Sequence, residues 1–445
     1  MNRLKNLSEG SFLKLLFAFF TGAFLIAAVC MPDRNAMFSG LWNILSQPSK
    51  ISANYFDIGG YSATFLNMGL VGLACLLLFL VFRGTPNNVS TLGFLLTQGF
   101  CSWGINILNM WPSIFGVMIY GLVKKEKQGS LVNAMLFSTG IAPLITDLLI
   151  RYPNAEVVGF NLPGLGLALA VGFVIGFFLP AGLAHSPKVH KGFDLYSAAL
   201  PIGMTAFLLK GILFETMGVA LPSAISDMKV TSQLTANIFC GTVFGLCVVF
   251  ALVLGCKPRD YWKLLRNPEL VSNFSSTYGN ATFLMNLGVF GLFILGYYNL
   301  IGAPFNGIVF GIIICMVCTC NSGSHPLNVL PIMLGYAAAS YLCGWSSPAG
   351  EEFKYVLNAQ AICVGLCYAN GLSPISQKYG WRYGFVAAIL HYLLATSVPG
   401  MHGGYCLYNG GFTAALICIL YVPQLERFFR TKQERLEHKA AKANK

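Results

Sequence analysis

The chain has 445 residues and a formal net charge of +12, yet only 10% of its residues are charged and 56% are hydrophobic. Soluble globular proteins carry about 25% charged residues, so this composition excludes a soluble domain and indicates a protein of the lipid bilayer. The positive charge does not indicate nucleic-acid binding, because the basic residues lie mainly in short loops and the tail, where membrane orientation requires them.

Apolar stretches close to the length of a membrane span follow one another along the chain. Lipid admits only helices or closed barrels, because every backbone polar group needs a partner, and these runs do not alternate as barrel strands do. We therefore predict an all-α membrane protein. The first series of segments covers 12–30, 62–82, 89–103, 107–123, 131–150, 164–184 and 193–213. The second series covers 235–255, 281–299, 304–320, 327–343, 355–372, 383–398 and 405–422.

The two series are related by blocks that recur in the same order, which indicates an internal duplication. Sequence letters match between 42–48 and 262–268, 63–72 and 281–291, 104–116 and 323–335, 140–143 and 371–374, and 187–196 and 399–408. We predict a first repeat over 1–214, a second repeat over 215–423 and a basic tail over 424–445.

The basic residues predict the orientation of the segments. With the N-terminus in the cytoplasm and one change of side per segment, 21 Lys and Arg lie inside and five lie outside. This bias follows the positive-inside rule and places both termini in the cytoplasm, in a bacterial inner membrane. Because seven is odd, the second repeat is inverted relative to the first, which is typical of secondary transporters and also occurs in some channels.

A helix-breaking motif occurs once in each repeat, between two apolar segments that are short for a membrane crossing. Gly104, Leu108, Asn109, Pro112 and Gly116 recur as Gly323, Leu327, Asn328, Pro331 and Gly335. Each pair of segments is compatible with a full crossing and with a re-entrant hairpin whose turn lies near the membrane midplane. Two opposed turns at that depth would bring the Asn side chains together at one site. The alternative is that Asn109 and Asn328 are interhelical hydrogen-bonding residues, with Gly and Pro as packing and kink positions.

Two further motifs are repeated. Ser138-Thr-Gly-Ile-Ala-Pro143 and Ala369-Asn-Gly-Leu-Ser-Pro374 predict helices broken by Gly and Pro, since Pro removes an N–H and clashes one turn back. His190 and His402 share a Pro-x-x-His-x-Gly pattern that fits gates or plain helix entries. The predicted substrate-binding residues are Asn106, Asn109, Ser138, Thr139, His325, Asn328, Asn370 and Ser373. The predicted gating or structural residues are Gly104, Pro112, Gly140, Pro143, His190, Gly323, Pro331, Gly371, Pro374 and His402.

The order of hairpin and broken helix, present twice and inverted, resembles the transport domain of elevator-type carriers such as the divalent-anion/sodium symporters. The resemblance covers this order only, and that family's Ser-Asn-Thr signature does not occur here, so none of its ligand residues is carried over. Seven-plus-seven inversion is similar to the nucleobase and anion exchanger fold, and the Asn-rich turns are similar to those of urea channels. The whole chain resembles a bacterial membrane family described as a domain of unknown function.

These features predict a carrier of a small polar or anionic solute, coupled to an ion such as sodium or a proton, with its site between the repeats. A passive channel for a neutral solute is the first alternative, and an intramembrane enzyme or a lipid-handling protein is the second. We expect no enzyme, because no nucleophile–base set or carboxylate cluster occurs at catalytic spacing. We expect no organic cofactor and no metal, and the cysteines at 315–320 have no other ligand near them in sequence. The expected partners are the lipid bilayer and the solute, and a homo-oligomer is left open.

Overall fold

A computed structural model describes residues 7–48, 50–154, 156–221, 230–270, 272–347 and 353–443. Helices and connecting loops make up these residues, and they contain no strand. Each of the fourteen predicted apolar segments contains an α-helix, so the all-α class is confirmed. Of the basic residues that set the predicted orientation, Arg3, Lys5, Lys229 and Lys445 lie outside the described ranges.

Among the described residues, nine helices are long and apolar enough to cross a membrane, as expected of a multi-pass membrane protein. They are α2 (Glu9–Cys30), α4 (Tyr55–Val81), α7 with α8 (Val132–Arg151), α9 (Leu162–Val189), α10 with the π-helix η4 (Ala199–Thr216), α11 (Gln233–Val253), α14 (Asn280–Leu300), α16 (Pro326–Trp345) and α21 with α22 (Asn409–Lys442).

Shorter helices complete the bundle and its two ends. Those inside the bundle are α5 (Asn88–Phe100), α6 (Trp111–Lys124), α15 (Gly307–Val317), α17 (Gln360–Ala369) and α19 (Trp381–Ala395). Those near the ends are α3 (Met37–Ser46), α12 (Pro258–Leu265), α13 (Phe274–Tyr278), α18 (Ser373–Lys378) and α20 (Val398–Met401). The tail helix α22 (Lys432–Ala443) is separated from α21 (Asn409–Phe428) by a short link.

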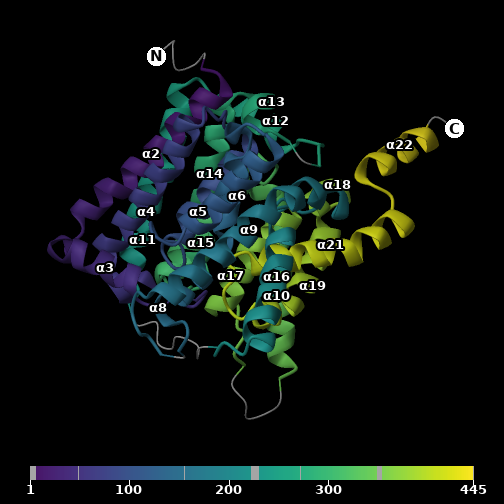
Figure 1. The fold of residues 1–445 in the computed structure, drawn as a ribbon. Coiled ribbons are helices and arrows are strands. Elements are labelled where there is room, and N and C mark those ends of the chain that lie inside the picture. Colours follow the sequence, from purple (N-terminus) through teal and green to yellow (C-terminus); the bar gives the residue numbers. More distant parts are fainter. Residues whose placement is uncertain are drawn as a thin grey trace.

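The bundle has two distinct ends, which we name after the short helices that lie there. Figure 1 shows α3 and α8 (Ala142–Arg151) at one end, and α12, α13 and α18 at the other. The start of α2 lies at the α12 end, where Asn273 Nδ2 donates to Glu9 Oε1 at 2.8 Å. The helices therefore run back and forth between the α3 end and the α12 end.

At the centre of the bundle, α5 and α15 pack side by side in opposite directions. A Cβ on Gly99 would lie 2.4 Å from the carbonyl oxygen of Gly311, and one on Gly311 would lie 2.3 Å from that of Gly99. Only glycine at both positions allows the two backbones to approach this closely. The start of α15 meets the end of α5, because Ser102 Oγ donates to Gly307 O at 2.7 Å.

Several buried contacts occur twice, at positions 219 residues apart. Asn67 Nδ2 donates to Cys101 O and Ile105 O at 2.8 and 2.9 Å. Asn286 Nδ2 donates to Cys320 O and Ser324 O, both at 2.9 Å. Gly60 and Gly279 both have φ of 84° at the start of a long helix. The matched ranges 63–72 and 281–291 differ in length by one residue, and these contacts pair Asn67 with Asn286.

The paired amides lead to a first prediction. We expect Asn67→Ala and Asn286→Ala each to lower the thermal unfolding midpoint of the purified protein, because each leaves two buried carbonyls without donors, at a cost of about 1–3 kcal/mol. Asn43→Ala is the control, since Asn43 is exposed on α3. A midpoint unchanged from the control in both variants would contradict the structural role of these contacts.

Candidate functional site

The two turns have the same internal hydrogen bonds. Asn109 Oδ1 accepts from Asn106 N at 2.8 Å, and Asn109 Nδ2 donates to Gly104 O at 2.9 Å. Asn328 Oδ1 accepts from His325 N at 3.0 Å, and Asn328 Nδ2 donates to Gly323 O at 3.0 Å. Each Asn therefore closes its own turn.

The two turns do not meet. The first lies at the α3 end, where Tyr55 N donates to Ser102 O at 3.2 Å. The second lies at the α12 end, where Ser272 N donates to Ser322 O at 3.2 Å. The antiparallel helices α5 and α15 separate them, and the 13 residues of α5 rise about 20 Å. Of the two interpretations left open, the one in which both Asn side chains gather at one site is therefore contradicted, while their substrate-binding role stays a prediction.

Each helix break binds a segment from the other half of the chain. The breaks are the 3-10 turns η3 (Thr139–Ile141) and η6 (Asn370–Leu372). Leu407 N donates to Gly140 O at 2.9 Å, and Leu195 N donates to Gly371 O at 3.1 Å. A Cβ on Gly140 would lie 2.3 Å from the Tyr408 ring, and one on Gly371 would lie 2.5 Å from the Tyr196 ring. These two reciprocal contacts join the halves through the blocks that follow His402 and His190.

The polar residues at the breaks have partners inside the protein. Thr139 Oγ1 donates to Leu136 O at 2.7 Å, and Ser138 Oγ lies 3.2 Å from Ser113 Oγ. Asn370 Nδ2 donates to Thr319 Oγ1 at 2.7 Å, and Ser373 Oγ lies 3.1 Å from Ser324 Oγ. They hold the breaks rather than lining any pocket described below.

The predicted prolines and histidines have structural contacts. Pro143 and Pro374 lie in the first turns of α8 and α18, and Pro112 lies in the first turn of α6. Pro331 lies inside α16. His190 Nε2 lies 2.9 Å from Ser197 Oγ. His402 is 2% exposed and packs edge-on against Phe412.

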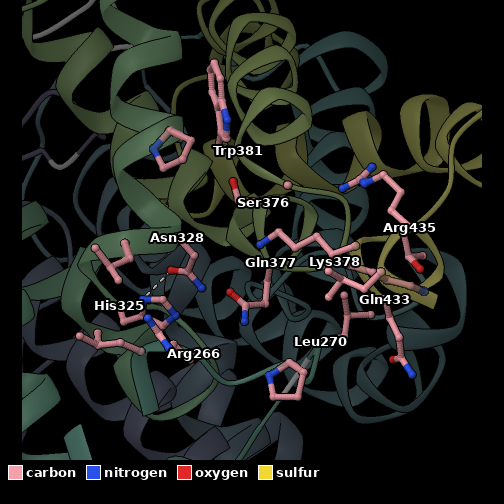
Figure 2. A pocket seen from close by; sticks show the side chains of 18 residues that line it. Arg266, Leu270, His325, Asn328, Ser376, Gln377, Lys378, Trp381, Gln433 and Arg435 are labelled. Carbon is pink, nitrogen blue, oxygen red and sulfur yellow. Dashed lines mark hydrogen bonds between the residues drawn. The ribbon is translucent and has the colours of Figure 1, made fainter. Parts of the chain in front are cut away.

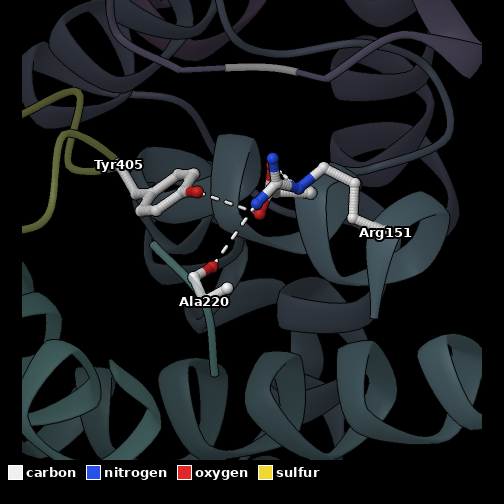
Figure 3. Close-up of polar contacts among 4 residues, drawn as sticks. Arg151, Ala220 and Tyr405 are labelled. Carbon is white, nitrogen blue, oxygen red and sulfur yellow. Dashed lines mark hydrogen bonds and ion pairs between the residues drawn. The ribbon is translucent and has the colours of Figure 1, made fainter. Parts of the chain in front are cut away.

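A buried charged cluster closes the α3 end beside the first turn (Figure 3). Asp147 Oδ1 lies 3.1 Å from Arg151 Nε, and Tyr405 Oη donates to Asp147 Oδ2 at 2.9 Å. Lys50 lies over the Tyr405 ring, 5.6 Å from its centroid, and is 8% exposed. Burial lowers the pKa of Lys50, although Asp147 opposes that shift. Asn109 Nδ2 also donates to Thr146 Oγ1 at 2.9 Å, which ties the turn to this cluster.

A basic pocket opens at the α12 end beside the second turn (Figure 2). Its volume is about 1020 Å³. Its charged lining residues are Arg266, Lys378, Lys432 and Arg435, and no Asp or Glu occurs among the described residues that line it. His325, Asn328, Ser376 and Gln377 supply other polar groups. Of the eight predicted substrate-binding residues, only His325 and Asn328 line this pocket.

The cluster and the pocket occupy matching places in the two halves. Asp147 comes four residues after Pro143, and Lys378 comes four residues after Pro374. Asp147 contacts Tyr405, while Lys378 lies over the Phe193 ring, 5.1 Å from its centroid. Tyr405 and Phe193 each follow their motif histidine by three residues. The first place therefore holds an ion pair, while the second holds Lys378 against an aromatic ring and borders the pocket.

The sequence interpretation missed the charged residues of both places. Extending the Gly-x-x-Pro match by four residues would have found Asp147 and Lys378. No sequence pattern could have found Lys50, Arg266 or Arg435, because only the fold brings them there.

A family model described as a protein of unknown function, DUF1576, matches residues 33–215 and 256–427. The chain belongs to this family. The two matched stretches of this DUF1576 protein contain both turns, both helix breaks and both reciprocal segments, while α22 lies beyond the second stretch. No curated protein and no solved structure matches the chain.

The burial of His325 predicts a pH dependence. Burial lowers the pKa of His325 to about 3, whereas its unfolded pKa is about 6.5. The unfolded chain therefore binds a proton at this site that the folded protein does not bind between these pH values, so stability falls as the pH falls. We expect His325→Asn to remove about 2 kcal/mol of the stability lost between pH 6.5 and 4.5.

This pH prediction is measured by thermal unfolding across pH, with His438→Asn as the control because His438 is exposed on α22. A His325→Asn profile that runs parallel to the wild-type profile would show that His325 does not contribute.

Proposed function

We propose that this DUF1576 protein is a membrane carrier that moves a small polar or anionic solute by alternating access. Its two halves form inverted repeats, and the reciprocal segments at Gly140 and Gly371 are the moving contacts between them. The proposal is supported chiefly by the unequal state of two equivalent places, a filled charged cluster at the α3 end and a hollow pocket at the α12 end. A carrier in one of its two states has this asymmetry.

The contacts suggest how the two states exchange. In the described state, Asp147 holds Arg151 and Tyr405 together and fills the α3 end. Opening that end requires Tyr405 to leave Asp147, and Tyr405 precedes Leu407, which is bound to Gly140. Closing the α12 end requires the Phe193 segment, bound to Gly371 through Leu195, to move over the pocket. The two segments are therefore proposed to move in opposite senses.

The predicted hairpins and orientation belong to the same proposal. The helices α5 and α15 have 13 and 11 residues, too few to cross a hydrocarbon core of about 30 Å unaided. We propose that the turns lie within the membrane boundary at opposite ends, with the α12 end and both termini toward the cytoplasm. Each end then forms a vestibule that reaches a turn.

The function is tested by solute counterflow in liposomes that contain the purified protein. Labelled solutes from a panel of phosphates, carboxylates and neutral polyols are offered outside, with sodium or proton gradients imposed or absent. A carrier takes up label faster when the same unlabelled solute is inside. A channel shows flux without this stimulation, which would contradict alternating access, and no flux of any solute class would contradict transport.

A matched pair of cysteines tests the exchange of states. Gln377 lines the pocket, and Thr146, which takes the equivalent place after Pro143, is 2% exposed. In a background without native cysteines, we expect Gln377→Cys to react with a small thiol reagent at least tenfold faster than Thr146→Cys. A transported solute should change the two rates in opposite directions. Equal rates, or rates that change together, would contradict the two-state proposal.

A further inference from the structure

We propose that the basic pocket at the α12 end binds the phosphate group of an organic phosphate, held between the second turn, α18 and the tail helix α22. This inference extends the proposed function by naming a class of ligand. Only the transport of the bound ligand rests on that function. Binding itself requires no transport.

The first support is the charge of the lining. Arg266, Lys378, Lys432 and Arg435 face one hollow, and none of them has a salt bridge to a described carboxylate. The neighbouring acidic residues bond elsewhere. Glu269 Oε2 accepts from Ser272 Oγ at 3.2 Å, and Glu434 Oε2 accepts from Thr431 N at 2.7 Å. Glu434, which is exposed, interacts electrostatically with Lys378, but the lining keeps an excess of positive charge that favours an anion.

The cations are held in place by neutral groups. The Arg266 guanidinium lies over the Trp262 ring, 4.5 Å from its centroid. Lys378 lies over the Phe193 ring, and Arg435 Nη2 donates to Tyr379 O at 2.5 Å. Aromatic faces and a carbonyl orient these side chains without neutralising them. A phosphate therefore finds donors whose direction is already set.

The second and independent support is a pair of buried polar groups without partners. His325 is 1% exposed, and its ring nitrogens make no hydrogen bond of good geometry with a described residue, although Gln377 of the same lining lies close enough to act on its pKa. Ser376 is 3% exposed, and its Oγ has no hydrogen-bond partner among the described residues. Both residues line the pocket (Figure 2). Unpaired buried polar groups are costly, and a phosphate oxygen in the pocket can accept from His325.

The size and the apolar wall indicate what carries the phosphate. Inorganic phosphate would fill a small part of about 1020 Å³, a volume typical of sites for larger ligands. The apolar part of the wall consists of Leu265, Pro268, Leu270, Leu327, Pro331, Trp381 and Leu436. A phosphate ester with an organic part satisfies both the basic and the apolar surfaces. Such an ester can be a soluble metabolite or a lipid headgroup.

The tail helix has a specific part in this site. Lys432 and Arg435 both come from α22, and Arg435 joins α22 to the end of α18 through Tyr379. The tail, whose charge the sequence analysis assigned to membrane orientation, therefore supplies half of the cations of the pocket.

The test uses the full-length purified protein and glycerol 3-phosphate as the soluble probe, with glycerol as the uncharged control. Calorimetry compares the wild type with a double variant, Lys378→Gln with Arg435→Gln. The matched control is Lys257→Gln with Arg259→Gln, which removes the same charge from exposed positions near α12. We expect at least tenfold weaker binding in the pocket variant, less than twofold change in the control, and no binding of glycerol.

A second arm separates the two sources of the phosphate. Nanodiscs with and without phosphatidylglycerol are compared by native mass spectrometry for lipid retained by each variant. Retained lipid that disappears only in the pocket variant assigns the same site to a headgroup. The proposal is overturned if neither the soluble probe nor the lipid depends on Lys378 and Arg435 more than on the control pair. Binding of the phosphate without any flux would contradict the carrier function but not the phosphate site. Flux without binding in the basic pocket would contradict the phosphate site but not the carrier function.

Discussion

The fold depends on satisfying the backbone where helices are broken inside an apolar bundle. In such surroundings an unpaired carbonyl or amide costs several kcal/mol. Here the carbonyl of Gly140 accepts from Leu407, and that of Gly371 accepts from Leu195. Each break is completed by a segment from the other half, so neither half can satisfy its own interior alone. This mutual requirement fixes how the two halves pack.

The α3 end and the α12 end differ in their charged residues, although the two halves have similar internal contacts. The contacts inside each half are closely alike, from the Asn67 and Asn286 amides to the Asn109 and Asn328 turns. The charged residues placed after the breaks are not alike, because Asp147 stands where the other half has Lys378. Asp147 attracts Arg151 and fills its end, whereas Lys378 has cations around it and leaves a hollow. A near-symmetric frame thus has unlike charges, and unlike packing, at its two ends.

The sequence predicted much of this fold, because membrane helices and their interruptions leave local patterns. The lengths of the apolar runs predicted the fourteen segments, and the Gly-x-x-Pro motif predicted the helix breaks at Gly140 and Gly371. The sequence could not predict the depth of the turns, because a full crossing and a re-entrant hairpin leave the same basic residues on each side of the membrane. The basic pocket was also beyond reach, because Arg266, Lys378 and Arg435 are far apart in sequence and meet only through tertiary packing.

The central claim is that the two halves have opposite orientations across the membrane. It is tested most directly by labelling single cysteines with a membrane-impermeant thiol reagent in intact cells and in inverted vesicles. Ser39 on α3 and Arg259 on α12 are exposed and lie on equivalent short helices. The account predicts that Ser39→Cys reacts only from outside and Arg259→Cys only from the cytoplasmic side. Labelling of both from the same side would contradict it.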